Sequence, residues 1–211
     1  MKLDKSTVLL YVITDRKLLG EHTIYTQVEE ALKGGATIIQ IREKNLGDEE
    51  FLNEAVLIKE ICRKYNVPLI INDNVQVALK SGADGVHVGQ DDMKAENVRK
   101  LIGGNKILGV SAHSVEEAIL AEKNGADYLG VGAIFTTSSK ADVQSTSIDT
   151  LKEICSTVRI PVVAIGGITS ENIKQLSGSG VSGAAVISAV FGQSDVRLAA
   201  EKLKNLIEDT V

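Results

Sequence analysis

The sequence predicts an α/β fold in which short aliphatic strands alternate with helices from one end of the chain to the other. Eight runs rich in Val, Ile, Leu and Ala are each followed by a segment with helical periodicity. The runs carry no polar face, which is typical of parallel strands buried on both sides. Eight strand–helix units in 211 residues favour one closed (β/α)8 barrel, a TIM barrel, that forms a single domain over residues 1–211.

The alternative is an open, doubly wound sheet. Such a sheet can carry a G-x-G-x-x-G turn after its first strand, and this chain has ITDRKLLG there instead. We expect strands near residues 8–13, 37–41, 68–72, 85–88, 107–110, 127–132, 161–165 and 183–187. The helices are expected near residues 25–33, 48–65, 74–81, 94–102, 114–124, 149–157, 170–177 and 195–208.

A repeated phrase marks the joints between helices and strands. It reads KGGATIIQI from Lys33, KSGADGVHV from Lys80, KNGADYLGV from Lys123 and, more loosely, GSGVSGAAVI from Gly178. The lysine suits the negative end of a helix dipole, and the glycine can take the left-handed conformation that ends a helix. The apolar run that follows is expected to be a buried strand.

Two helices show further signals. Ser114 followed by Glu117 predicts a capping box at the start of one helix. In residues 48–65, acids open the segment, bases close it, and a helical period brings five side chains to one face. These are Phe51, Ala55, Ile58, Cys62 and Tyr65.

Composition excludes several classes of protein. The net charge of −5 and the 3% aromatic content argue against nucleic-acid binding, which needs clustered cations and stacking rings. No run is long enough for a membrane span, and the N-terminus has no signal-peptide pattern. Cys62 and Cys155 have no metal or redox spacing and are interpreted as buried thiols. We expect a cytoplasmic protein and leave open whether it forms a homo-oligomer.

Polar residues follow the carboxyl ends of the predicted strands, which meet on one face of a barrel. Asp73 and Asp92 follow the third and fourth strands, and a pair of carboxylates there suits Mg²⁺, whose other ligands are water and phosphate. The alternative is that each aspartate caps a helix, because both precede helical patterns.

The segment Gln40-Ile41-Arg42-Glu43-Lys44 ends the second strand. Strand alternation places Gln40, Arg42 and Lys44 toward the barrel interior or its mouth, and leaves Glu43 as an ordinary surface charge. Two cations beside a metal site predict a bound polyphosphate. The alternative is a structural ion pair with Asp73.

Two loops could bind a further phosphate. Residues 136–147 form the longest polar run and are interpreted as a lid that carries Lys140 and hydroxyls onto substrate, with a surface loop as the alternative. Gly166-Gly167 after the seventh strand and Ile187-Ser188 after the eighth are where this fold usually cradles phosphate, although simple turn geometry would also explain the glycines. Two anion sites at one mouth suggest transfer between two phosphorylated substrates.

The histidines give no clear catalytic group. His87 lies inside a strand, where an interior histidine with its hydrogen bonds satisfied is the simpler interpretation. His113 follows Ser111 at a strand end and is ambiguous, and His22 lies in a predicted loop. The chain has no nucleophile elbow.

These motifs together resemble the thiamine phosphate synthase family, whose members have a TIM barrel fold. The resemblance covers almost the whole chain and rests on the order of YVITDR, QIREK, NDN, GADGVHVGQDDM, GVSAHS, GADYLGVGAIFTTSSK, PVVAIGGI and AAVISA. One stretch departs from the family pattern: the lid usually reads P-T-x-T-K, and this chain has Thr136-Thr-Ser-Ser-Lys140.

The resemblance implies a role for each site residue. The contacts to hydroxymethylpyrimidine diphosphate would be Gln40, Ile41, Arg42, Glu43, Lys44, Asn72, Ser111 and Lys140. The contacts to thiazole phosphate would be Thr137, Ser138, Ser139, Gly167, Ile187 and Ser188. Asp73 and Asp92 would bind Mg²⁺, and Arg42, Lys140 and Ser111 would be catalytic.

The implied reaction expels pyrophosphate from the pyrimidine methylene, and the thiazole nitrogen captures the resulting cation. Charge stabilisation then needs no general base. One alternative is a thiazole tautomerase-like isomerase on the same fold, which would not need the diphosphate residues. Others are a phosphate-binding isomerase or epimerase with a base–acid pair, and a non-catalytic ligand-binding regulator.

Overall fold

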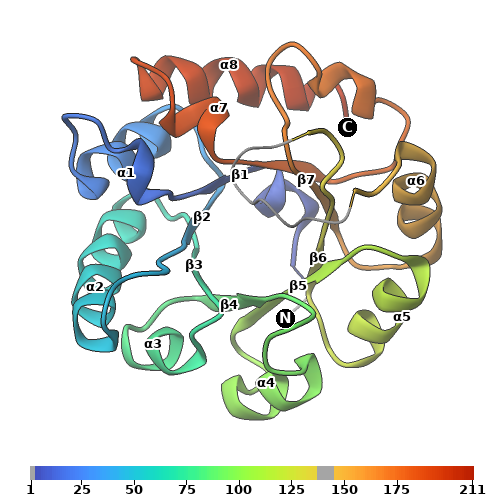
Figure 1. The fold of residues 1–211 in the computed structure, drawn as a ribbon, viewed down its shortest axis with the longest axis horizontal. Helices are drawn as coiled ribbons and strands as arrows, with labels where there is room; N and C mark the ends of the chain where they lie inside the picture. The colour runs from blue at the N-terminus through green and yellow to red at the C-terminus, as the bar shows by residue number, and fades with distance from the viewer. Residues whose placement is uncertain (1–2, 137–144) are drawn as a thin grey trace.

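The computed structural model describes residues 3–136 and 145–211, and it forms a closed barrel of parallel strands inside a ring of helices (Figure 1). The order of strands around the barrel follows the chain from β1 to β8. β8 pairs with β1, with Leu10 beside Ala184, and closes the barrel. The predicted (β/α)8 barrel is therefore confirmed, and the open-sheet alternative is wrong.

The elements alternate as the sequence predicts. The strands are β1 (Leu10–Ile13), β2 (Ile38–Ile41), β3 (Leu69–Asn72), β4 (Gly85–Val88), β5 (Ile107–Ala112), β6 (Tyr128–Val131), β7 (Val162–Ile165) and β8 (Gly183–Val186). The α-helices are α1 (Ile24–Lys33), α2 (Asp48–Lys64), α3 (Val75–Lys80), α4 (Ala95–Ile102), α5 (Val115–Lys123), α6 (Ile148–Thr157), α7 (Ser188–Phe191) and α8 (Val196–Glu208). Short 3-10 segments are η1 (Lys5–Val8), η2 (Arg16–Leu18) and η3 (Ile173–Leu176).

The first strand begins later than the prediction of residues 8–13. The Asp4 carboxylate accepts hydrogen bonds from the backbone N–H and the hydroxyl of Ser6, both at 2.9 Å, and starts the 3-10 turn η1. Val8 ends that turn and is fully buried in the core inside the barrel, below β1. The polar contacts of Asp4 therefore place Val8 in a 3-10 turn, and the strand begins only at Leu10.

The helix predicted over residues 170–177 is only the 3-10 segment η3. Asn172, which precedes it, uses its side chain in the loop: it accepts from the Thr169 N–H at 2.8 Å and donates to the Gly167 carbonyl at 2.8 Å. The short helix α7 was not predicted, because its four residues are too few to show a helical period.

Strand alternation divides the core into two parts. On β1, Leu10 and Val12 point outward into the layer between strands and helices, whereas Tyr11 and Ile13 point into the barrel. On α2, the predicted apolar face is buried except at Tyr65, which is half-buried and donates a hydrogen bond to Glu29. Glu54 is also buried on this helix, although its charge gave no sign of it.

The repeated phrase builds the same joint several times. Gly35, Gly82 and Gly125 all have a positive φ, as the phrase predicts. Two residues after each comes a side chain that accepts a hydrogen bond from the backbone N–H at the start of the preceding strand. Thr37 accepts from Leu10 at 3.0 Å, Asp84 from Leu69 at 2.7 Å and Asp127 from Leu108 at 2.8 Å. The repeat therefore closes the end of the barrel opposite the strands' carboxyl ends.

The predicted capping box at Ser114 forms only in part. The Ser114 hydroxyl accepts from the Glu117 N–H at 3.3 Å, but the Glu117 carboxylate accepts from the N–H of His113 at 2.7 Å. None of the described helices combines the length and the apolar character that a membrane span requires.

Candidate functional site

The polar residues at the carboxyl ends of β2 to β5 form the candidate site. Gln40 is 3% exposed and donates a hydrogen bond to the Tyr11 hydroxyl inside the barrel at 2.7 Å. The next residue, Ile41, is fully buried in the outer core, so only its backbone could reach a ligand at the mouth. The Arg42 N–H donates to the buried Thr14 hydroxyl at 3.0 Å, which ties the chain after β2 to the end of β1.

Glu43 is not the surface charge that alternation predicted. Its side chain is 3% exposed and accepts two hydrogen bonds from Arg16, at 3.0 and 3.1 Å. Arg16 also donates to Glu54 at 2.6 Å. One guanidinium thus holds two buried carboxylates, and Glu43 anchors the segment that carries Arg42 and Lys44. A direct contact between Glu43 and substrate is difficult with this side chain engaged.

Burial raises the pKa of Glu54, and the hydrogen bond and charge of Arg16 only partly oppose that effect. The second carboxylate oxygen of Glu54, Oε1, is buried without a hydrogen-bond partner. A buried carboxylate with one unsatisfied oxygen is costly while it is ionised. Arg16 thus holds the segment after β2 in place through Glu43, while Glu54 keeps one buried oxygen without a hydrogen bond.

Asp73 lies directly after β3 in the left-handed conformation, with φ of 62°. Its N–H donates to the His87 carbonyl at 2.8 Å, which continues the β3–β4 pairing by one residue. Its carboxylate accepts from the Lys44 ammonium at 2.8 Å. The ion pair that was the alternative interpretation of the cations is therefore present for Lys44.

Asp92 lies beside Asp73. Partial burial raises the pKa of Asp92, and the neighbouring Asp73 carboxylate raises it further, while the N–H of Gly89, which donates at 2.7 Å, lowers it. Neither aspartate caps a helix: Asn74 caps α3, and Lys94 precedes α4. The helix-capping alternative is wrong for both residues.

Two adjacent carboxylates with one lysine fit a divalent cation. The cation would relieve the repulsion that raises the pKa of Asp92. The described residues contain no group of three or more His, Cys, Asp and Glu side chains that could bind a metal ion. A two-carboxylate site of this kind suits Mg²⁺, which keeps water and substrate phosphates as its other ligands.

A hydrogen-bonded chain crosses the barrel interior and ends at Ser111. Tyr11 and Tyr128 join their hydroxyl groups at 2.7 Å, Tyr128 reaches His87 Nδ1 at 2.9 Å, and His87 Nε2 reaches the Ser111 hydroxyl at 3.0 Å. The interpretation of His87 as a satisfied interior histidine agrees with these contacts. The roles of Tyr11 and Tyr128 were missed, although a tyrosine inside an otherwise aliphatic strand was the available signal.

The remaining predicted residues lie on the other side of the mouth. Gly166 and Gly167 have φ of 97° and 63°, and a Cβ on Gly167 would collide with the Thr136 carbonyl. The Phe135 N–H donates to the Gly166 carbonyl at 3.0 Å, so the loop after β6 runs alongside the loop after β7. Ser188 is exposed at the start of α7 and follows Ile187.

Several predicted residues cannot be placed. Thr137, Ser138, Ser139 and Lys140 lie outside the described residues, as does most of the predicted lid over residues 136–147. Asn72, the last residue of β3, pairs in register with His87 and lies next to Asp73. The described part of the site therefore brings together Gln40, Arg42, Lys44, Asn72, Asp73, Asp92 and Ser111 at neighbouring strand ends.

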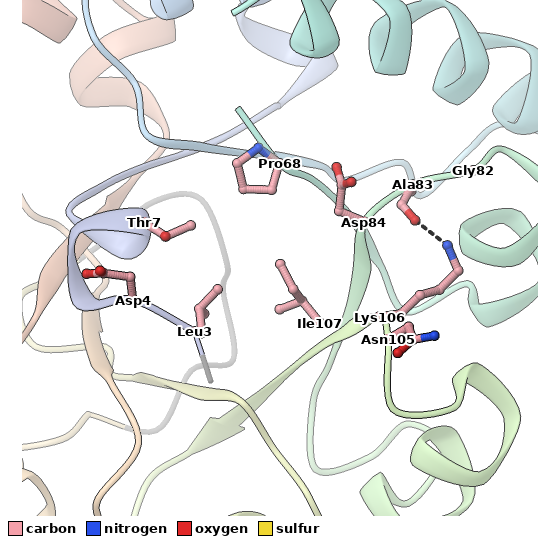
Figure 2. A pocket seen from close by; sticks show the side chains of 10 residues that line it. All are labelled: Leu3, Asp4, Thr7, Pro68, Gly82, Ala83, Asp84, Asn105, Lys106 and Ile107. Carbon is pink, nitrogen blue, oxygen red and sulfur yellow. Dashed lines mark hydrogen bonds between the residues drawn. The ribbon is translucent and has the colours of Figure 1, made fainter. Parts of the chain in front are cut away.

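A cavity of about 430 Å³ lies at the opposite end of the barrel (Figure 2). The charged side chains of Asp84 and Lys106 in its lining are paired within the protein. Lys106 donates to the Ala83 carbonyl, and Asp84 accepts from Lys59 at 2.6 Å and from the Leu69 N–H at 2.7 Å. The described residues at this end form the joints between helices and strands, so we place the candidate site at the mouth instead.

Comparison with known proteins gives one consistent result. A family model described as thiamine monophosphate synthase matches residues 10–190. A protein named thiamine-phosphate synthase from Ruminiclostridium cellulolyticum is 54% identical over 194 residues, which are 92% of each chain. Its namesake from Clostridium tetani is 52% identical over 200 residues, 95% of this chain and 96% of the other.

A solved structure agrees with the sequence comparisons. The thiamine phosphate pyrophosphorylase of Pyrococcus furiosus superposes with a TM-score of 0.90 at 42% identity, over 98% of each chain. A second structure, from Bacteroides thetaiotaomicron, has a TM-score of 0.69 at 19% identity and supports the fold alone.

Proposed function

The chain belongs to the thiamine monophosphate synthase family, and from that membership we propose that it condenses hydroxymethylpyrimidine diphosphate with thiazole phosphate. The products would be thiamine phosphate and pyrophosphate. The observation that carries the proposal is the grouping of Asp73, Asp92 and Lys44 next to Arg42 and Gln40 at the barrel mouth. This grouping supplies oxygen ligands and cations to a diphosphate, which is the leaving group of the reaction.

The residues of the chain would act mainly by binding and charge stabilisation. When bound, Mg²⁺ would offset negative charge on the departing pyrophosphate, and Asp73 and Asp92 would hold it. Arg42 and Lys44 would bind the diphosphate oxygens, and Lys140 would do the same from the loop after β6. Gln40 and Asn72 would orient the pyrimidine beside Ser111. The bond between the methylene carbon and the diphosphate oxygen breaks, and the thiazole nitrogen forms the new bond to that carbon.

The second substrate would bind on the β6 to β8 side of the mouth. The close approach of the Gly167 backbone to Thr136 leaves no room for a side chain, which supports a role for this backbone beside an anion. Gly167, Ile187 and Ser188 would contact the thiazole phosphate, together with Thr137, Ser138 and Ser139. No general base is required, which agrees with the interior hydrogen bonds of His87.

The tautomerase-like alternative is not favoured. The relatives described above are named as synthases, and an isomerase would have no use for paired carboxylates with a lysine at the diphosphate position. For the same reason a non-catalytic regulator is not favoured. We also propose that the enzyme acts in the cytoplasm.

A direct assay tests the proposal. Purified protein is mixed with hydroxymethylpyrimidine diphosphate, thiazole phosphate and Mg²⁺, and thiamine phosphate and pyrophosphate are measured. We expect equal amounts of both products, loss of activity with EDTA, and recovery when Mg²⁺ is restored. Circular dichroism with EDTA controls for unfolding. Isomerisation of the thiazole without pyrophosphate release would support the tautomerase instead.

A further inference from the structure

The hydrogen-bonded chain inside the barrel has a direction that its chemistry fixes. The Gln40 amide nitrogen can only donate, so the Tyr11 hydroxyl oxygen accepts at that end. The Tyr11 proton then needs an acceptor, because a buried hydroxyl left without one is costly. Among the described residues, the structure gives Tyr11 one further polar partner, the Tyr128 hydroxyl at 2.7 Å.

The same reasoning continues along the chain. Tyr128 accepts from Tyr11 and donates to His87 Nδ1 at 2.9 Å. A histidine whose Nδ1 accepts must carry its proton on Nε2, and that proton is donated to the Ser111 hydroxyl at 3.0 Å. Ser111 therefore uses an oxygen lone pair toward the barrel interior, and its own proton remains available at the mouth.

The two tyrosine hydroxyl groups in this chain are buried and keep their protons. Tyr11 and Tyr128 are at most 2% exposed, and burial raises the pKa of both hydroxyl groups, so they stay protonated and neutral near pH 7. The two rings are packed against each other with centroids 5.7 Å apart. A Cβ on Gly109 would collide with Tyr128 and lie 2.5 Å from His87 Nδ1, so glycine is what admits this contact.

We propose that Tyr11, Tyr128 and His87 are positioning residues that fix the direction of hydrogen bonding at Ser111, so that the Ser111 hydroxyl donates its proton to an acceptor atom of the pyrimidine diphosphate. The acceptor is a ring nitrogen or a diphosphate oxygen. This inference rests on the proposed function for the identity of the substrate, but the direction of the chain does not. Hydrogen bonds in series also polarise one another, which strengthens the last donor.

A spectroscopic test needs no substrate. His113 provides an internal reference, because its Nδ1 contacts the Gly132 carbonyl at 2.6 Å and must donate to it. In protein labelled with ¹⁵N in the histidine rings, we expect His87 to be protonated on Nε2 and His113 on Nδ1. Variants His22→Gln and His113→Gln assign the signals without altering the chain. Protonation of His87 on Nδ1, which a reversed Gln40 amide would produce, overturns the proposal.

Two matched variants separate positioning from packing. Tyr128→Phe keeps the ring but removes the donor to His87, so the Nε2-protonated form loses its preference. Tyr11→Phe leaves the Tyr128 hydroxyl able to donate to His87 but removes the proton that fixes its direction, so the preference for the Nε2-protonated form should weaken without being lost. We expect kcat/KM to fall roughly 10-fold in Tyr128→Phe and less than about 3-fold in Tyr11→Phe. Equal losses in both variants would indicate a packing effect and contradict the proposal.

A double-mutant cycle tests whether the chain acts through Ser111. Once Ser111→Ala has removed the last hydroxyl, Tyr128→Phe should reduce kcat/KM no further. Independent, multiplying losses would overturn the inference. If the assay yields no thiamine phosphate at all while the histidine signals are as expected, the proposed function fails and the directed chain stands.

Discussion

Asp73 combines an unusual backbone conformation with a charged side chain, and its conformation guides the choice of variant. Its φ of 62° favours Asn and Gly over other residues. Asp73→Asn should therefore fold normally while it removes a charge from the metal site. We expect kcat to fall on the order of 100-fold at limiting Mg²⁺, with an unchanged denaturation midpoint.

Asp15→Asn is the matched control for Asp73→Asn. Asp15 also follows a strand end, but its carboxylate accepts from the Lys17 N–H at 3.0 Å, a role that asparagine can keep. Its kcat should stay within about 2-fold of the wild type. An equal loss in both variants, or Asp73→Asn turnover at the wild-type rate, contradicts the metal assignment.

Glu54 should make the protein less stable as the pH rises. Burial raises its pKa in the folded state, so the folded protein holds this proton more tightly than the unfolded chain. Glu54 therefore increases the free energy of unfolding when the pH is below its unfolded-state pKa. This contribution is lost as the pH rises through its folded-state pKa. Relative to wild type, Glu54→Gln should gain stability as the pH rises above the ordinary glutamate pKa of about 4.3.

Urea denaturation at several pH values measures that effect. Glu60→Gln provides the control, because Glu60 lies on the same helix with its side chain 56% exposed. The stability difference between Glu60→Gln and wild type should change little with pH. A Glu54→Gln difference that is flat or has the opposite slope would show that Arg16 outweighs burial.

Individual residues were predicted best where position alone decides their role. The sequence located Asp73, Asp92 and Lys44 because strand ends gather on one face of a barrel. Glu43 was misinterpreted, since its burial depends on Arg16, a residue whose side-chain direction no periodicity reveals. The partners of Glu54 and the hydroxyl groups of Tyr11 and Tyr128 likewise depend on contacts between strands far apart in the chain.

At the scale of elements, two glycines at helix ends test different physical effects. Gly34 has an ordinary φ of −78°, but a Cβ there would lie 2.6 Å from the Ala200 Cβ of α8 and collide with the Arg197 carbonyl. Gly82 has φ of 72° and open space around it. Gly34→Ala should lower the free energy of unfolding by about 3 kcal/mol, and Gly82→Ala by about 1 kcal/mol.

Urea denaturation of the two variants makes the comparison, with kcat as a check that the mouth is intact. Gly47→Ala is a suitable control, because Gly47 has a negative φ and no atom within 4 Å of its added Cβ. It should be nearly neutral. A larger loss at Gly82 than at Gly34 would mean that backbone strain outweighs the close contact of α1 with α8.

Element boundaries failed where local polar contacts compete with the pattern. The Asp4 cap replaced the start of the first strand by η1, and the side-chain contacts of Asn172 left η3 where a helix was predicted. Longer elements such as α2 and α8 were placed to within a residue or two, because their apolar faces repeat over several turns.

At the scale of the whole molecule, the two thiols report on unfolding. Burial raises the pKa of the Cys62 thiol to about 12 and that of Cys155 to about 11, so neither is a thiolate at pH 8. Cys62 is fully buried between α2 and the barrel. We expect an aromatic disulfide reagent to modify Cys62 only as fast as the whole barrel unfolds, with both thiols reacting at once in urea.

A Cys155→Ser variant isolates the signal of Cys62 in that experiment. Its rate of modification should follow the urea dependence of global unfolding measured by circular dichroism. Rapid reaction of Cys62 in native buffer would mean that α2 detaches while the rest of the barrel stays folded.

The joints at Thr37, Asp84 and Asp127 give the barrel a modular construction. Each one connects an odd strand to the even strand that follows, and the corresponding backbone bond from Ser182 to the Val162 carbonyl joins β7 to β8. The barrel of the enzyme can therefore be regarded as four pairs of neighbouring strands, and one of these hydrogen bonds joins the two strands of each pair. A redesign that exchanged or re-ordered segments would preserve all four hydrogen bonds if it cut the polypeptide within α2, after α4 or after α6. A cut between the two strands of one pair would separate the residues that form its hydrogen bond.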